Sequence, residues 1–232
     1  MANSYFNFKQ FSVNQSNTAM KVGTDGVLLG TWAECEGAKT ALDLGTGTGL
    51  LALMLAQRNK DVKITAIDIE STEDAEENFR NSPWGDRLTT QKIAVQELET
   101  QKFDLIICNP PYFKNSLKCP GSSRTVARHS VGLSFEELAE NCRRLLHANG
   151  KISLILPSDT LGEIEQIFKD NNLFVIRICR VFPREDLAVK RVMLEFSFLQ
   201  QEPQNESVTI EISRHNYTQE YKYLTKDFYL EK

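Results

Sequence analysis

The chain has 232 residues, of which 41% are hydrophobic and 25% are charged, a composition typical of one folded α/β domain with its own core. Its longest apolar runs are too short to span a bilayer, so we expect no membrane attachment. The formal net charge of −4 excludes indiscriminate attraction to polyanions, although it leaves room for a local basic site.

The first forty residues differ in pattern from the rest of the chain. They lack a basic stretch followed by an apolar one, so we expect no secretory signal. Residues 6–15 predict a short strand or hairpin, and residues 24–36 predict a helix capped by Thr24 or Asp25. We therefore interpret residues 1–36 as an N-terminal segment outside the main core.

Strands and helices alternate from residue 40 onward. Strands are predicted over residues 40–45, 62–68, 102–109, 151–157, 173–183 and 191–199, and helices over residues 50–58, 71–82, 134–150 and 158–172. The helix at 134–150 begins with a Ser-x-x-Glu capping box and stops at Asn-Gly. This alternation predicts an α/β fold whose mainly parallel sheet carries helices on both faces.

The whole chain, residues 1–232, is expected to form a single domain. Residues 40–200 make its core and residues 201–232 a tail. Residues 200–207 are polar and contain Pro and Asn, which indicates a solvated loop. The five cysteines are widely spaced and form no C-x-x-C pair, so we predict no metal site, no disulfide framework and a cytoplasmic location.

A glycine-rich turn follows the strand at 40–45. Gly45, Gly47 and Gly49 let the backbone turn tightly and approach a ligand. Asp43 precedes the turn, and Asp68 ends the next strand, where a carboxylate can accept both hydroxyls of a ribose. The spacing G-x-G-x-G departs from the dinucleotide pattern G-x-G-x-x-G, and no residues suited to a pyrophosphate are evident. S-adenosyl-L-methionine (AdoMet) is therefore favoured over NAD, and a turn that binds nothing is the structural alternative.

The sequence Asn109-Pro110-Pro111-Tyr112 ends the strand at 102–109, at the sheet edge that also carries the glycine turn. An exocyclic amine on a base is a poor nucleophile because its lone pair is delocalised into the ring, and acceptors at its hydrogens bias the nitrogen towards attack. The Asn109 side-chain oxygen and the Pro110 carbonyl, held by two stiff prolines, can be those acceptors. Tyr112 offers a flat face for a flipped base. The alternative is a plain strand terminator with an exposed tyrosine.

The motifs DLGTGTG, AIDIE and NPPY, in this order, resemble those of class I AdoMet-dependent amino-methyltransferases. The resemblance implies a Rossmann-like class I methyltransferase fold with a mainly parallel, seven-stranded sheet, and the product S-adenosyl-L-homocysteine. Enzymes with N-P-P-Y methylate adenine N6, cytosine N4 or the amide of glutamine, so this motif leaves the substrate open. Residues 8–33 closely resemble the N-terminal signature of the bacterial tRNA1(Val) (adenine(37)-N6)-methyltransferases, and the resemblance continues to about residue 200. It implies methylation of the N6 amine of adenine 37 in the anticodon loop of a valine tRNA.

The resemblance also implies that residues 20–26 fold over the AdoMet site. Lys21 and the start of the helix near Thr24 could then hold the methionine carboxylate, whereas a solvated Lys21 is the structural alternative. Related enzymes often have an Asp after the third strand that contacts the adenine ring of AdoMet. Ala94 stands there, so backbone groups of Ala94 and Val95, or the side chain of Gln96, would take over that contact.

Two groups of basic residues are candidates for contacts with the RNA backbone. The first follows the N-P-P-Y motif and comprises Lys114, Lys118, Arg124 and Arg128. The second surrounds the tip of a hairpin between the last two strands and comprises Arg180, Arg184, Lys190 and Arg191, with Arg177 nearby. Ordinary solvated charges are the alternative for each of these residues.

Two rival functions remain. One is methylation of a protein glutamine amide, as in release-factor modification, but the chain is too short for the separate N-terminal helical domain that those enzymes carry. The other is non-catalytic binding of RNA or nucleosides, which has no need for the paired acceptors of Asn109 and Pro110. We predict an enzyme whose partner is tRNA, with no obligate protein partner and a monomeric state.

Overall fold

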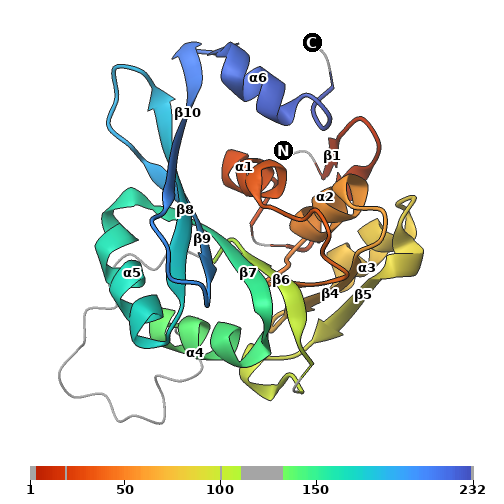
Figure 1. Cartoon of the computed structure of the whole chain (residues 1–232). Coiled ribbons are helices and arrows are strands. Elements are labelled where there is room, and N and C mark those ends of the chain that lie inside the picture. The colour runs from red at the N-terminus through yellow and green to blue at the C-terminus, as the bar shows by residue number, and fades with distance from the viewer. Residues whose placement is uncertain (1–3, 19, 100, 111–132, 231–232) are drawn as a thin grey trace, which may run out of the picture.

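The computed structural model describes residues 4–18, 20–99, 101–110 and 133–230. In this part of the chain a twisted nine-stranded sheet has the strand order β11-β10-β8-β9-β7-β6-β3-β4-β5, and a two-stranded hairpin lies near the N-terminus (Figure 1). The strands are β1 (Tyr5–Asn7), β2 (Ser12–Asn14), β3 (Thr40–Leu44), β4 (Lys63–Asp68), β5 (Leu88–Lys92), β6 (Phe103–Cys108), β7 (Leu146–Pro157), β8 (Phe174–Arg184), β9 (Arg191–Ser197), β10 (Gln204–Ser213) and β11 (Asn216–Tyr217). The helices are α1 (Thr24–Trp32), α2 (Leu50–Arg58), α3 (Glu73–Arg80), α4 (Phe135–Leu145), α5 (Leu161–Asp170) and α6 (Gln219–Thr225).

The centre of the sheet is parallel. Neighbouring strands β7, β6, β3, β4 and β5 all run in one direction, because helices connect successive strands and return the chain to the same end. Strand β9 enters antiparallel between β7 and β8. The expected Rossmann-like α/β class is confirmed, with two strands more than the seven that the resemblance implies.

Helices cover both faces of the sheet (Figure 1). One face packs against α1, α2 and α3, where Leu28 and Leu53 are fully buried, and the other packs against α4 and α5, where Leu138 and Phe168 are buried. Because both faces are covered, β3 is apolar along nearly its whole length, and its one charged residue, Asp43, has no exposed surface. Within the described residues, none of the helices has the length and apolarity needed to cross a membrane.

The predicted solvated loop at 200–207 is partly wrong, because it contains the start of β10. This strand pairs in parallel with β8, and α6 after it packs against α1. Arg177 of β8 forms an ion pair with Glu206 of β10 at 2.8 Å and stacks on Trp32, 4.1 Å from the ring centroid. The basic residue Arg177 is therefore a structural tie inside the sheet. The polar sequence of β10 concealed this strand, because paired charges replace the usual apolar alternation.

The helix predicted over residues 134–150 ends earlier, at Leu145. Its capping box between Ser134 and Glu137 is present. The residues that follow belong to β7 because Leu146 lies opposite Phe103 of β6. Pairing with β6 thus ends the helix before the chain reaches the Asn-Gly sequence that was expected to end it.

The predicted hairpin before the first helix is confirmed as β1 and β2. Helix α1 begins after Gly23, and neither Thr24 nor Asp25 caps it through its side chain. The carboxylate of Asp25 instead accepts a hydrogen bond from Arg191 of β9 at 2.7 Å. This ion pair ties the start of α1 to the edge of the sheet where the parallel strands end.

Candidate active site

The glycine turn and the asparagine of the N-P-P-Y motif leave the sheet side by side. Strands β3 and β6 are parallel neighbours, and their last residues, Leu44 and Cys108, lie opposite each other. In the sheet, β3 has β4 on one side and β6 on the other, so the strand order changes direction at β3. Open α/β sheets bind ligands at such a position, outside the carboxyl ends of the strands.

The three glycines of the turn have different roles. All three adopt left-handed backbone conformations, with φ of 72° at Gly45, 54° at Gly47 and 80° at Gly49. A Cβ atom at Gly49 would lie 2.4 Å from the Phe79 ring, so this glycine is needed for helix packing. A Cβ atom at Gly45 would meet nothing within 4 Å among the described residues. Gly45 therefore faces open space at the sheet edge, as a ligand-binding turn requires.

Asp43 lies beneath this turn, and one of its two carboxylate oxygens accepts no hydrogen bond from the described residues. Its Oδ2 accepts hydrogen bonds from the Thr46 hydroxyl at 2.6 Å and from the Ala52 N–H at 3.2 Å. Its Oδ1 is buried and has no hydrogen-bond partner within the described part of the chain. Burial raises the pKa of the Asp43 carboxyl to about 7. Through Thr46 and Ala52, Asp43 supports the glycine turn and the start of α2 from below, so its role in cofactor binding stays a prediction.

Asp68 ends β4 as predicted and is half-buried. Its Oδ2 accepts a hydrogen bond from the Gly47 N–H at 3.0 Å, and its Oδ1 accepts one from the Glu70 N–H at 2.9 Å. Each carboxylate oxygen can accept a second hydrogen bond. Asp68 therefore holds the glycine turn in shape and keeps acceptor capacity for a ribose.

Ala94 and Val95 follow β5 near Asp68, because the Ile93 N–H donates to the Asp68 carbonyl at 3.0 Å. Their own carbonyls are engaged by the protein. The Ala94 carbonyl accepts from the Glu97 N–H at 2.9 Å, and the Val95 carbonyl accepts from Arg144 at 2.6 Å. The predicted contact of Ala94 and Val95 with the adenine ring stays a prediction. Because their carbonyls already accept hydrogen bonds, the backbone N–H groups are the better candidates for that contact.

Asn109 directly follows β6 and is half-buried, and Pro110 behind it is buried. The Nδ2 of Asn109 lies 3.9 Å from the Sδ of Met20, so the N-terminal segment reaches this position. The predicted catalytic residues Pro111 and Tyr112 lie outside the described residues.

Part of the N-terminal segment, residues 14–18 and 20–23, passes over the glycine turn, and we call these residues the strap. Asp74 of α3 accepts hydrogen bonds from the N–H groups of Asn17 and Thr18 at 3.0 and 2.8 Å, from the Thr18 hydroxyl at 2.7 Å and from the Asn17 side chain at 3.1 Å. A Cβ atom at Gly47 would lie 3.2 Å from the Thr18 methyl group, so the strap touches the turn. The side chain of Asn78 donates to carbonyls on both the strap and the turn.

Lys21 forms hydrogen bonds within the strap. Its ammonium donates to the carbonyl of Gln15 and, at 2.9 Å, to the carbonyl of Thr18. The first turn of α1 begins three residues later, at the exposed Thr24. An ammonium has three donors, so one remains after these two bonds. The role of Lys21 and Thr24 in holding a methionine carboxylate stays a prediction, with Lys21 already engaged in structural contacts.

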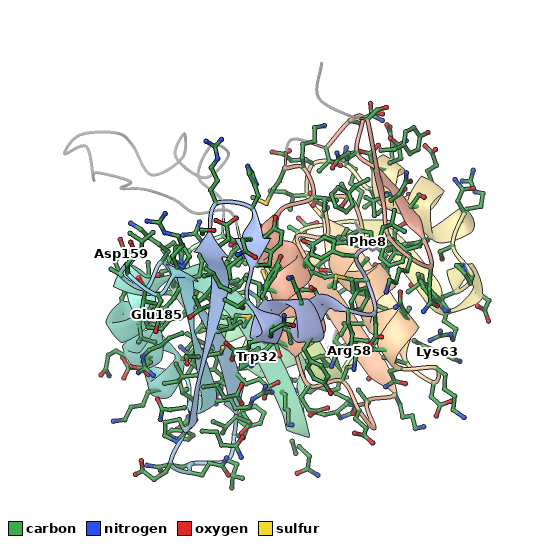
Figure 2. All side chains as sticks on the ribbon, turned by 90° about the horizontal axis from the view of Figure 1, so that it is seen from above. Phe8, Trp32, Arg58, Lys63, Asp159 and Glu185 are labelled. Atoms are coloured by element: carbon green, nitrogen blue, oxygen red, sulfur yellow. The ribbon has the colours of Figure 1, made fainter. Side chains whose placement is uncertain are left out.

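The second basic group is less available than its sequence suggests. Arg184 pairs with Asp186 at 3.0 Å, Arg191 pairs with Asp25, and Arg180 donates to Asn205 at 2.9 Å. Lys190 is exposed beside them. The hairpin that carries these residues lies beside the end of β7, because the Ser158 hydroxyl donates to the Val189 carbonyl at 2.8 Å. Figure 2 shows Asp159 and Glu185, which follow β7 and β8, on the same side of the molecule.

The first basic group, comprising Lys114, Lys118, Arg124 and Arg128, lies outside the described residues. Sequence reasoning also missed two contributors to the site, Asp74 and Asn78, and it did not connect Met20 with Asn109. Asp74 carries an acidic charge in the first turn of a helix, a pattern that helix electrostatics alone explains. A pattern of local residues could not reveal that its partners lie more than fifty positions earlier in the chain.

The family described as the methyltransferase small domain matches residues 16–170. A tRNA1(Val) (adenine(37)-N6)-methyltransferase of Phocaeicola vulgatus is 44% identical over 232 residues, which cover 99% of this chain and 99% of the relative. The structure of a predicted O-methyltransferase of Agrobacterium tumefaciens has a TM-score of 0.65 at 20% identity, covering 88% of this chain and 96% of its own. An O-methyltransferase from neocarzinostatin biosynthesis, solved with S-adenosylmethionine, has a TM-score of 0.53 at 12% identity, covering 74% and 52%. The two structures share the fold, and the sequence matches show that the chain belongs to the methyltransferase small domain family and, within it, to the tRNA1(Val) (adenine(37)-N6)-methyltransferases.

Proposed function

We propose that this chain transfers the methyl group of AdoMet to the N6 amine of adenine 37 in tRNA1(Val). One observation carries the chemistry: Asn109 leaves the sheet next to the glycine turn, because β6 and β3 are parallel neighbours that end together. The near full-length similarity to a relative of that name supports the choice of substrate.

The cofactor would lie on the turn between Gly45 and Gly49. Gly45 leaves open space for the methionine part, Asp43 supports the turn from below, and Asp68 fits the ribose hydroxyls. AdoMet supplies, when bound, a methyl group on a positively charged sulfur, and it leaves as S-adenosyl-L-homocysteine. Hydrogen bonds from the Gly47 N–H to Asp68 and from the Thr46 hydroxyl to Asp43 hold this turn, so the protein's own groups provide much of the required geometry.

Asn109 and Pro110 would direct the adenine amine. The Asn109 Oδ1 and the Pro110 carbonyl accept its two N–H groups, which turns the nitrogen lone pair out of conjugation with the ring. No general base has to remove a proton before the transfer, because the amine attacks in its neutral form. The positively charged methylated nitrogen then releases one proton to solvent, which gives neutral N6-methyladenine. Positioning of reacting groups can supply roughly 7–11 kcal/mol of the barrier reduction, and electrostatic stabilisation adds to it. Tyr112 remains the proposed stacking partner of the base.

The tRNA backbone would approach across the hairpin between β8 and β9. Lys190 is exposed at this edge and would contact phosphates, whereas Arg184 and Arg191 would first have to exchange their carboxylate partners. Within the described residues this leaves a small basic surface for RNA, and Lys114, Lys118, Arg124 and Arg128 stay further candidates for phosphate contacts.

The test is methyl transfer from tritiated AdoMet to an unmodified tRNA1(Val) transcript. A transcript with guanine at position 37 and a bacterial release factor serve as matched acceptors. We expect label in the first acceptor only, and mass spectrometry of its nucleosides to show N6-methyladenosine. Label in the release factor would favour a glutamine amide as substrate, and AdoMet binding without transfer to any of the three acceptors would contradict the proposal.

A further inference from the structure

The strap brings one apolar side chain to the asparagine of the N-P-P-Y motif. The Sδ of Met20 lies 3.9 Å from Nδ2 of Asn109, and Met20 is 47% exposed although its side chain is apolar. On the basis of the function proposed above, we infer that Met20 is a positioning residue for methyl transfer. It favours the orientation of the Asn109 amide that presents Oδ1 to the adenine amine.

A side-chain amide has two orientations that differ by half a turn and occupy nearly the same space. One orientation offers Oδ1 as an acceptor to the hydrogens of the adenine amine. The other offers Nδ2, a donor, to groups that are themselves donors, and this arrangement cannot activate the amine. The choice between the two orientations therefore decides whether Asn109 can act.

The Met20 sulfur distinguishes these orientations because it accepts hydrogen bonds weakly and donates none. With Nδ2 towards the sulfur, an N–H group meets an acceptor. With Oδ1 towards the sulfur, two atoms with lone pairs face each other. Met20 thus favours the orientation in which Oδ1 points away from the strap.

Hydrogen bonds hold described residues on either side of Met20. Thr18, two positions before it, is held by Asp74, and Lys21 after it donates to carbonyls of the strap. The Val22 N–H donates to the Gln15 side chain at 2.8 Å. These bonds restrain the strap near Met20, so its side chain can direct a neighbour.

Packing alone gives little reason for an apolar side chain here. Met20 belongs to neither buried core cluster of the described residues, and almost half of its surface is exposed. If it only filled space, leucine would serve equally well. The sulfur acceptor is the property that leucine lacks, which makes the two explanations separable.

The experiment compares Met20→Leu, Met20→Gln and the wild type with unmodified tRNA1(Val) transcript. Leucine keeps the size and removes the acceptor, whereas glutamine places an amide oxygen at similar reach. Leu199→Gln, at a site that is 62% exposed beyond β9, is the matched surface control. The readouts are kcat, KM for tRNA and the Kd of AdoMet from calorimetry.

We expect Met20→Leu to lower kcat about two- to fivefold, the effect of one weak hydrogen bond, with the Kd of AdoMet within about twofold of wild type. Met20→Gln should retain kcat, and the control should match the wild type. The inference is overturned if leucine leaves kcat unchanged, if glutamine lowers it as much as leucine does, or if AdoMet binding falls in parallel with kcat. A wild type that does not methylate the transcript would refute the proposed function itself.

Discussion

Asp74 anchors the strap, and we expect its replacement by alanine to weaken AdoMet binding strongly. Four hydrogen bonds from Asn17 and Thr18 converge on its carboxylate over distances of 2.7 to 3.1 Å. Burial acts to raise the pKa of Asp74, but the hydrogen bonds from Thr18 and Asn17 outweigh it and hold the pKa below its ordinary value. The group is therefore charged at neutral pH, and its stabilising contribution is lost only as the pH falls through this lowered value.

The magnitude follows from those four bonds. A hydrogen bond to a charged group contributes roughly 1.5–3 kcal/mol, so simple addition would give about 6–12 kcal/mol. Addition overestimates the loss, because neighbouring bonds are coupled and the released groups regain water, and we expect about 3 kcal/mol in the docking of the strap. If the strap must dock for AdoMet to bind, this loss raises the Kd on the order of 100-fold.

The assay is calorimetry with AdoMet on Asp74→Ala, Asp74→Asn and Glu73→Gln. Asparagine keeps an acceptor oxygen, so its Kd should rise roughly tenfold or less. Glu73 is exposed on the same turn of α3, so its variant removes one carboxylate charge near the helix start without touching the strap. An Asp74→Ala protein that is folded and binds AdoMet as tightly as the Glu73→Gln control would refute the reasoning.

Three further outcomes are expected. Asn109→Ala should lower methyl transfer about 100- to 1000-fold while the Kd of AdoMet stays within a few-fold, and equal loss of both would contradict the assigned role. Because burial raises the pKa of Asp43 to about 7, the folded chain holds a proton that the unfolded chain releases above its ordinary pKa, so the free energy of unfolding should fall as the pH rises towards and through 7. Urea denaturation at several pH values should show this decline in the wild type and not in Asp43→Asn. Lys190→Gln should reduce the salt dependence of tRNA binding by about one phosphate contact. Lys63→Gln, at the first residue of β4 and across the molecule from Glu185 in Figure 2, should leave the slope unchanged.

The part of the site that lies at strand ends could be predicted from the sequence. Gly45, Asp68 and Asn109 each follow a recognisable apolar strand, and parallel register brings such ends to one sheet edge without further information. The bounds of α2 were predicted to the residue for a similar reason, since its leucines and alanines follow the glycine turn directly. At these positions the local hydrophobic pattern and the parallel α/β fold predict the same placement of the residue.

The basic residues show where such reasoning fails. Lysine and arginine can be counted in a sequence, but the count does not reveal their partners. Arg177, Arg184 and Arg191 all have carboxylate partners in the fold, and two of those partners, Glu206 and Asp25, are far away in the chain. A cluster of five positive charges thus reduces to a much smaller binding surface.

The strap connects the two halves of the proposed chemistry. The strap contacts the glycine turn through Thr18 and Asn109 through Met20. The hydrogen bonds that hold the strap in place come mainly from Asp74 on α3. The turn has its own support in Asp68, which accepts the Gly47 N–H. The contacts of the strap are therefore separable. Substitutions that remove the Asp74 or Thr18 contacts should affect AdoMet affinity, whereas those that remove the Met20 contact should affect kcat.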